Sequence, residues 1–98
     1  MSYSMKEIEK KTGVKRHCLH TWILIGLFIP SPESKIARGN GIRSEYSEKD
    51  AYKISLLKKL LEAGIHGKLA KLLTSSNQGI STAEKLLKDI EALSRSLE

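Results

Sequence analysis

The stretch TGVKRHCLHTWILIG, residues 12–26, decides the fold of this chain. On a helical wheel the residues between its two glycines separate into two faces. Leu19, Trp22 and Ile25 share an apolar face, and Cys18 lies beside them. The opposite face is cationic and hydrogen-bonding and holds no acid; it comprises Lys15, Arg16, His17, His20 and Thr21. We predict a helix from about Lys15 to Ile25 that rests one face on a core and presents the other outward.

A second short helix should precede this one. Ser4-Met-Lys-Glu7 has the form of a capping box, in which the serine hydroxyl accepts from a backbone amide and the glutamate reaches back. The helix should bury Met5 and Ile8 and end near Thr12, because Gly13 can adopt the positive φ that a sharp stop requires. Two short helices joined by a tight glycine turn are typical of a helix-turn-helix.

Residues 27–46 hold both prolines and a glycine-rich tip, R38-G-N-G41. β-prone pieces flank this tip at 27–29 and 42–46, which predicts a small β-hairpin, the wing. Ile23 and Leu24 leave two alternatives, packing against the wing or the third helix, or a patch for a partner protein. We favour packing.

The remainder of the chain predicts more helix. Apolar residues at helical spacing indicate a long helix after a cap-like Ser47–Asp50 and a short one over 67–73. After a polar linker at 74–79, Ser81–Glu84 forms a further capping box. The last helix then repeats apolar residues in steps of three and four, as in a short coiled coil, at Ala83, Leu86, Ile90, Leu93 and Leu97. We favour dimerisation through this seam over a helix folded back on its own domain.

These elements predict a mostly α protein, a winged helix-turn-helix with a small β-hairpin wing and a C-terminal helix. We expect a DNA-binding domain over residues 1–73, a linker over 74–79, and a C-terminal helix over 80–98. The charge follows the same division. Residues 1–73 hold 14 Lys or Arg and 7 Asp or Glu, a net charge of +7, whereas residues 74–98 carry −1. The basic part therefore favours an anionic partner.

Metal and membrane sites are disfavoured. The chain has one cysteine and three histidines, and Cys18 points to the apolar face, so a closed four-ligand zinc site lacks donors. The longest apolar run, Trp22–Ile25, is far too short to span a bilayer, which takes about 20 apolar residues. No signal peptide is apparent, and nothing resembles a catalytic constellation. We expect no enzyme, no metal and no cofactor.

Several segments, in this order, resemble the MerR-type winged-helix DNA-binding domain. They are YSMKEIEKKTGVKRHCLHTW (3–22), IGLFIPSP (25–32), a glycine- and arginine-rich hairpin, YSEKD (46–50) and LLKKLLEAGI (56–65). The resemblance covers residues 3–73. It implies a bacterial, homodimeric transcriptional regulator that reads a roughly palindromic operator in double-stranded DNA. It also implies a cytoplasmic, nucleoid-associated location, and we count RNA polymerase as a further candidate partner.

The resemblance also implies roles for particular residues. Lys15, Arg16, His17, His20 and Thr21 fall on the exposed face of the recognition helix. Wing contacts to phosphate fall to Arg38, Asn40 and Arg43, and Lys68 falls on a second, helical wing. The terminal helix corresponds to the family's dimerisation coiled coil, and its seam residues are Leu86, Ile90, Leu93 and Leu97. Members of the family often carry an aromatic residue at position 21. Thr21 departs from that pattern, and the departure weakens one usual phosphate contact.

Two other functions stay open at this stage. Phage excisionases use similar small winged helices to bend DNA, so the chain could be an architectural accessory protein. Alternatively, it could be a protein-interaction adaptor that works through Ile23 and Leu24 or through the C-terminal seam.

Overall fold

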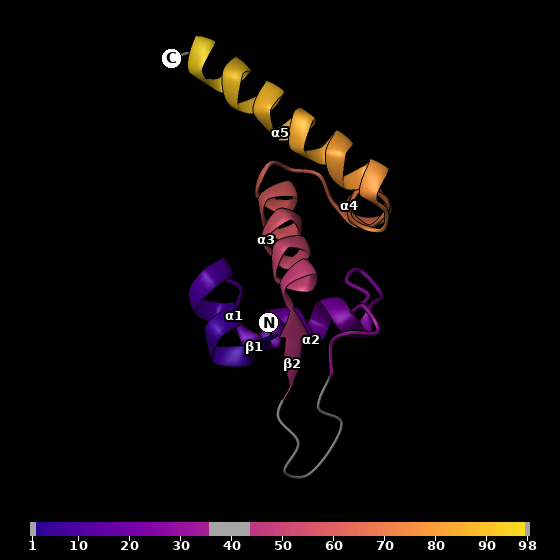
Figure 1. The fold of residues 1–98 in the computed structure, drawn as a ribbon. Helices are drawn as coiled ribbons and strands as arrows, with labels where there is room; N and C mark the ends of the chain where they lie inside the picture. The colour runs from indigo at the N-terminus through magenta and orange to yellow at the C-terminus, as the bar shows by residue number, and fades with distance from the viewer. Residues whose placement is uncertain (1, 36–43, 98) are drawn as a thin grey trace. The chain divides into compact units, whose positions relative to one another are not determined.

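The computed structural model describes residues 2–35 and 44–97, which form two compact units, residues 1–55 and 56–98. The first unit contains β1 (Ser2–Ser4), α1 (Met5–Thr12), α2 (Arg16–Leu24), β2 (Glu45–Ser47) and the start of α3 (Glu48–Glu62) (Figure 1). Its two strands are antiparallel, with Tyr3 opposite Tyr46. The buried apolar side chains of this unit are Ile8, Val14, Leu19, Trp22, Phe28, Tyr46, Ala51 and Ile54.

Both predicted ends of the first helix are confirmed. The Ser4 N–H donates to Glu7 Oε1 at 3.0 Å, and the Glu7 N–H donates to Ser4 Oγ at 3.3 Å, which completes the capping box. At the other end Gly13 has a φ of 77°, and its N–H donates to the Glu9 carbonyl at 2.8 Å. Ile8 is fully buried and Met5 is half-buried, as expected for the inward face.

Helix α2 ends one residue earlier than predicted, and this changes its apolar face. Gly26, at φ 78°, donates its N–H to the Ile23 carbonyl, and the Leu27 N–H donates to the Trp22 carbonyl at 2.9 Å. This pattern is the Schellman motif, which turns the chain out of the helix. Ile25 therefore lies past the last helical residue and no longer follows the helical periodicity. It is 69 % exposed, so the prediction that it faces inward is wrong.

Because of the same turn, the strand predicted at 27–29 does not form. The amides of Leu27 and Phe28 both donate to the Trp22 carbonyl, so they cannot join a sheet ladder. β2 instead pairs with β1, a three-residue strand that the sequence did not predict. Leu24 is 85 % exposed while Ile23 is half-buried, so the favoured packing of this pair holds in part for Ile23 and is wrong for Leu24.

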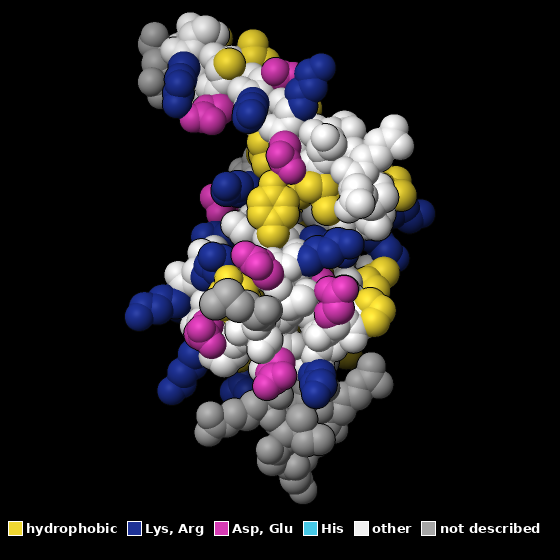
Figure 2. All heavy atoms as spheres, viewed as in Figure 1, with side chains coloured by type: hydrophobic (Ala, Val, Ile, Leu, Met, Phe, Trp, Pro, Cys, Tyr) yellow, Lys and Arg dark blue, Asp and Glu magenta, His cyan; other side chains and the backbone are white. Residues whose placement is uncertain are grey.

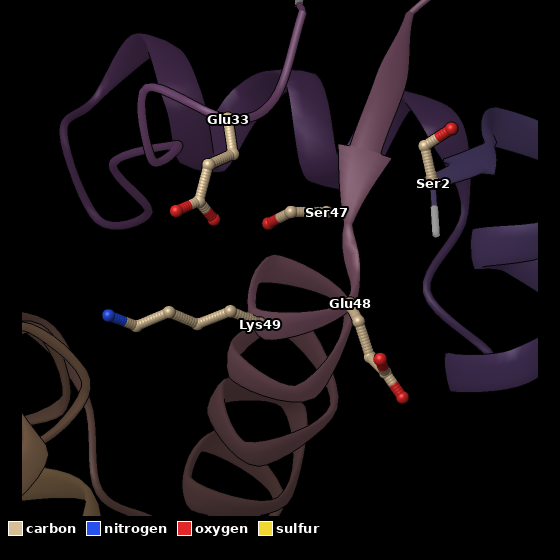
Figure 3. A pocket seen from close by; sticks show the side chains of 5 residues that line it. All are labelled: Ser2, Glu33, Ser47, Glu48 and Lys49. Atoms are coloured by element: carbon tan, nitrogen blue, oxygen red, sulfur yellow. The ribbon is translucent and has the colours of Figure 1, made fainter.

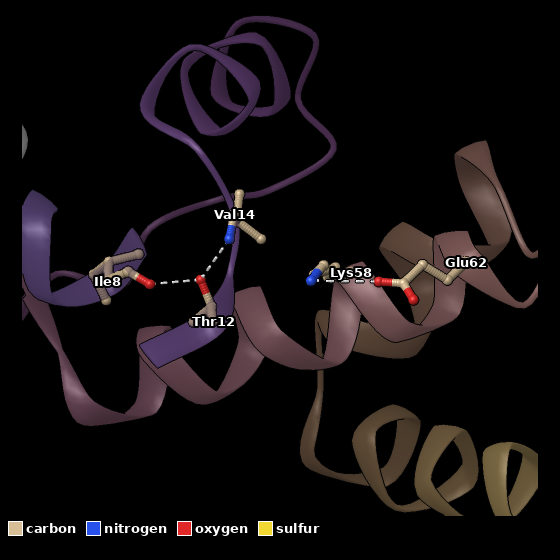
Figure 4. Close-up of polar contacts among 5 residues, drawn as sticks. All are labelled: Ile8, Thr12, Val14, Lys58 and Glu62. Atoms are coloured by element: carbon tan, nitrogen blue, oxygen red, sulfur yellow. Dashed lines mark hydrogen bonds and ion pairs between the residues drawn. The ribbon is translucent and has the colours of Figure 1, made fainter. Parts of the chain in front are cut away.

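The second unit contains the later part of α3, α4 (Gly67–Thr74) and α5 (Asn77–Ser96). Its core is formed by Leu56, Leu60, Leu73 and Ala83, with Ile65, Ile80, Leu86 and Leu87 packed against it. Helix α3 ends in a second Schellman motif, in which Gly64 (φ 90°) and Ile65 donate their amides to Leu61 and Leu60. An exposed ion pair joins Lys58 and Glu62 on α3 at 3.5 Å (Figure 4).

Helix α5 begins at Asn77, four residues before the predicted cap at Ser81. The Ser76 hydroxyl accepts from the Gly79 N–H at 3.0 Å, so Ser76 is the N-cap. The extra turn brings Ile80 against the core of the unit. Only Ser75 and Ser76 separate α4 from α5 in place of the polar linker predicted at 74–79.

The two helices meet backbone to backbone at Gly79. A Cβ at this position would lie 2.6 Å from the Leu72 carbonyl oxygen and 2.9 Å from that of Leu73. Figure 1 shows α5 passing over α4 near its start and then continuing beyond it. Leu93 and Leu97, near the far end of α5, are 63 % and 86 % exposed.

The predicted fold class is confirmed. Among the described residues the chain is mostly helical, with five helices and one two-stranded antiparallel sheet. None of the helices in the described part is long and apolar enough to cross a membrane.

Candidate nucleic-acid interface

The turn between α1 and α2 is held by one hydroxyl group. Thr12 Oγ1 donates to the Ile8 carbonyl at 2.6 Å and accepts from the Val14 N–H at 3.1 Å (Figure 4). Thr12 and Val14 are both buried. The hydroxyl thus ties the last turn of α1 to the residue that leads into α2, and it helps to fix the angle between the two helices.

Helix α2 presents the polar face that the sequence predicted. Its apolar side buries Leu19 and Trp22, and Cys18 is partly buried. The five residues of this segment that were predicted to contact DNA are all exposed, namely Lys15, Arg16, His17, His20 and Thr21. The first turn carries no acid, and Lys15 caps the helix without a side-chain hydrogen bond. The free amides and the positive end of the helix dipole therefore lie at the same end of the helix as Lys15 and Arg16, which favours an anion such as phosphate.

Thr21 differs from its neighbours because its hydroxyl proton is already used. Thr21 Oγ1 donates to the His17 carbonyl at 2.9 Å within the helix. Phosphate oxygens only accept hydrogen bonds, so Thr21 would have to give up this bond to contact the DNA backbone. Of the five residues on this face, Thr21 is therefore the weakest candidate for a phosphate contact.

Arg16 also acts on a buried neighbour. Tyr46 is fully buried on β2, and burial raises the pKa of its hydroxyl above the ordinary value of 10.0. Ser44 and the positive charge of Arg16 lower this pKa, and the charge of Asp50 raises it. Burial is the largest of these effects, so the net shift of the Tyr46 pKa is upward.

The remaining predicted contacts lie elsewhere. Arg38, Asn40 and Arg43 fall outside the described residues. The chain on either side of them is joined by a bridge between Lys35 and Glu45, whose amides donate to each other's carbonyls at 2.7 Å. Lys68 belongs to the second unit, where it is exposed in the first turn of α4.

A hollow of about 530 Å³ lies beside the start of α3 and is unsuited to nucleic acid. It is lined by Ser2, Glu33, Ser47, Glu48 and Lys49 (Figure 3). Two carboxylates against one ammonium group disfavour a polyanion. Within residues 2–35 and 44–97, no three side chains of the His, Cys, Asp or Glu type gather as a metal site.

Charge on the face drawn in Figure 2 is mixed. Figure 2 shows one face of the molecule, on which Lys and Arg side chains alternate with Asp and Glu and form no patch of one sign. The outward face of α2, by contrast, has no acidic residue. The acid-free outward face of α2 thus differs from the face drawn in Figure 2.

Comparison with known families agrees with this geometry. A family model described as MerR HTH family regulatory protein matches residues 3–77, which include the helix-turn-helix, all of α3 and all of α4. Searches of curated proteins and of solved structures gave no match. The chain belongs to the MerR family of helix-turn-helix regulatory proteins and is a DNA-binding transcription regulator.

Proposed function

We propose that the chain binds a specific operator in double-stranded DNA, as a MerR-type regulator that acts as a homodimer on a palindromic site. The observation that supports this most directly is the outward face of α2, which places five exposed donors beside a bare helix N-terminus and contains no acid. A recognition helix inserts its first turns into the major groove, where such groups meet base edges and phosphates.

Within this proposal the residues divide by their chemistry. Arg16 and His17 read base edges, with His20 nearby, because a guanidinium can donate two parallel bonds to guanine. The remaining cationic and polar residues hold phosphates and set the register; these are Lys15, Thr21, Arg38, Asn40, Arg43 and Lys68. Thr21 does so only by giving up its hydrogen bond to the His17 carbonyl. We further propose that RNA polymerase is a second partner and that the protein works at the nucleoid in the cytoplasm.

The test begins with selection of bound sequences from random duplexes, which yields the operator, its symmetry and its half-site spacing. The variant Arg16→Ala with His17→Ala should then bind the selected duplex at least ten-fold more weakly, since one good base contact is worth about 1–3 kcal/mol. Fluorescence anisotropy at fixed salt measures the affinity. The control, Lys10→Ala with Lys59→Ala, removes two exposed cations from other helices. If the recognition variant stays within about 1 kcal/mol of wild type, the assignment of base contacts to α2 is wrong.

We propose that the dimer forms through the far half of α5. Leu86 is half-buried and packs against the core of its own unit, whereas Leu93 and Leu97 are largely exposed. Ile90 lies between them and is half-buried. The half of the seam that its own unit does not cover is the half available to a second copy.

One observation favours a second candidate function. Leu24, Ile25 and Ile29 are all more than half exposed at the exit from α2, as a protein-binding adaptor would require. An adaptor would have no salt-dependent affinity for DNA, so an electrophoretic shift at two salt concentrations separates it from the regulator. Footprinting separates the architectural alternative, which would cover phased, bent sites instead of one operator.

A further inference from the structure

Two histidines lie on the outward face of α2. His17 and His20 are both exposed, and at a spacing of three residues they are neighbours on the helix surface. Lys15 and Arg16 add two permanent positive charges at the start of the same helix, which contains no acid. Histidine is the side chain that gains or loses its charge between about pH 5 and 8. The positive charge of this face therefore depends on pH in the physiological range.

The acids that flank α2 in the chain are engaged or placed elsewhere. Glu7 belongs to the capping box of α1, Glu9 is half-buried on α1, and Glu33 lines the hollow beside the start of α3. The lysines of α1 are exposed. The ion pairs between described residues lie on α3 and α5 and include neither histidine. In the free protein, a proton on either imidazole therefore meets the like charges of Lys15 and Arg16 without an ion pair to a described acid.

The elements behind α2 contribute two titratable side chains. The charge of Arg16 acts on Tyr46 of β2, and the charge of Asp50, at the start of α3, acts on the same hydroxyl. Both side chains are fully buried. Burial raises the pKa of Tyr46 above 10.0, so its hydroxyl is neutral at physiological pH. Asp50 Oδ2 accepts hydrogen bonds from two serines of the loop after α2. A change in the charge of the outward face with pH thus comes from the two histidines.

A phosphate backbone reverses the balance for a proton on this face. An opposite charge nearby favours the charged form of a titratable group, and a like charge disfavours it. When α2 lies in the major groove, phosphates offset the charges of Lys15 and Arg16 and attract a protonated imidazole. The bound protein then holds more protons than the free protein. Because the coupling between two ligands is reciprocal, protons must in turn strengthen the binding of DNA.

We propose that DNA binding by α2 is coupled to proton uptake at His17 and His20, so that the protein binds its operator more tightly as pH falls. This inference rests on the proposed DNA-binding function and names the proton as a signal that acts on the same face. A protonated imidazole donates from both ring nitrogens, so either histidine can contact a phosphate oxygen or a base acceptor in this state.

The affinity for the selected duplex is measured by fluorescence anisotropy at two pH values and at several salt concentrations. Wild type should bind about five-fold more tightly at about pH 6 than at about pH 8 for each histidine that takes up a proton. The slope of log affinity against log salt should also be steeper at the lower pH, by about 1 for each histidine. Circular dichroism at both pH values checks that the helical content is the same.

The variant His17→Gln with His20→Gln keeps hydrogen-bonding side chains at both positions but cannot take up a proton there. Whatever affinity it loses overall, the affinity that remains should be the same at both pH values. The matched control is His66→Gln, which removes an exposed histidine at the N-cap of α4 and should keep the wild-type pH dependence. Calorimetry in two buffers of different ionisation enthalpy counts the protons taken up on binding. This number should be positive for wild type and near zero for the double variant.

The outcomes separate this inference from the proposed function. If wild type shows no salt-dependent affinity for DNA at either pH, the proposed function fails, and this inference fails with it. If wild type binds with a salt-dependent affinity that is equal at both pH values, or tighter at the higher one, the inference alone is overturned. The same holds if the double variant keeps the wild-type pH dependence, or if His66→Gln abolishes it.

Discussion

At the scale of single residues, three polar groups inside the first unit determine how the candidate interface is built. Thr12 ties the end of α1 to the turn before α2, Asp50 accepts hydrogen bonds from Ser31 and Ser34, and Tyr46 is fully buried on β2. All three are buried, so each affects the protein through what a lost hydrogen bond or a new charge would cost in the interior.

Thr12→Val should lower the free energy of unfolding by about 1–3 kcal/mol. The change keeps the shape of the side chain but leaves the buried Val14 N–H without its acceptor. Urea unfolding followed by circular dichroism measures the effect. Thr82→Val is the matched control, because its hydroxyl makes a similar helical bond to Gln78 at an exposed position. A loss for Thr12→Val no larger than for Thr82→Val would contradict the role given to this hydroxyl.

Tyr46 predicts a loss of stability at high pH. Burial raises its pKa above 10.0, so the folded state keeps the hydroxyl proton to a higher pH than the unfolded chain does. The unfolded state then binds fewer protons, and the free energy of unfolding falls as pH rises past about 10. Between about pH 9 and 11, the free energy of unfolding of Tyr46→Phe, measured by urea unfolding, should fall less steeply than that of wild type. If the free energy of unfolding of the two proteins changes with pH in parallel, the Tyr46 hydroxyl has the same pKa in the folded and unfolded states, and the prediction is wrong.

The candidate interface was predicted best where the signal is local. The exposed face of α2 follows from its helical period, and all five predicted residues are exposed. The hydrogen bonds from Ser31 and Ser34 to buried Asp50 were missed because the partners lie up to 19 residues apart. Serines on both sides of a glycine-rich tip were the one available signal. Ile25 was wrongly predicted to face inward because helical periodicity does not extend past the end of the helix at Leu24.

At the scale of elements, helix ends were predicted where the chain itself supplies the cap. The Ser4–Glu7 box and the stop at Gly13 depend on neighbours within a few residues. The start of α5 was not predicted, because Ser81–Glu84 is as good a local signal as Ser76. Burial of Ile80 against the core decides between them. Strand β1 was missed for a similar reason, since its partner follows some 40 residues later.

Gly79→Ala separates close packing from helix propensity. Alanine in place of glycine normally stabilises a helix by up to about 1 kcal/mol. Here the added Cβ would meet two backbone carbonyls of α4, which cannot swing aside as a flexible side chain can. We expect a net loss of about 1–3 kcal/mol in urea unfolding. Ser81→Ala, exposed on the same helix, should change little, and a more stable Gly79→Ala protein would contradict the contact.

At the scale of the whole molecule, α5 serves two purposes along its length. Its first turns belong to the core of the second unit, and its last turns expose Leu93 and Leu97. The first half of α5 thus packs against its own unit, and the dimer contact that we propose involves the second half.

The proposed dimer should depend on the far half alone. Leu93→Asp with Leu97→Asp should give a monomer in sedimentation velocity without loss of helical signal, since neither side chain is buried. Ala92→Asp with Ser94→Asp adds the same charge beside the seam and should leave the dimer intact. A wild-type chain that sediments as a monomer at high micromolar concentration would contradict the proposal.

The division of α5 between a packed half and a free half has a consequence for mixtures of chains. If only the free half holds two copies together, dimers can separate while both units of each copy stay folded. Subunits should then exchange between dimers at the rate of dissociation, without unfolding of either unit. A copy with a defective recognition helix would capture intact copies and leave them with one working half-site. Such a variant should therefore be dominant over the wild-type protein when the two are produced together.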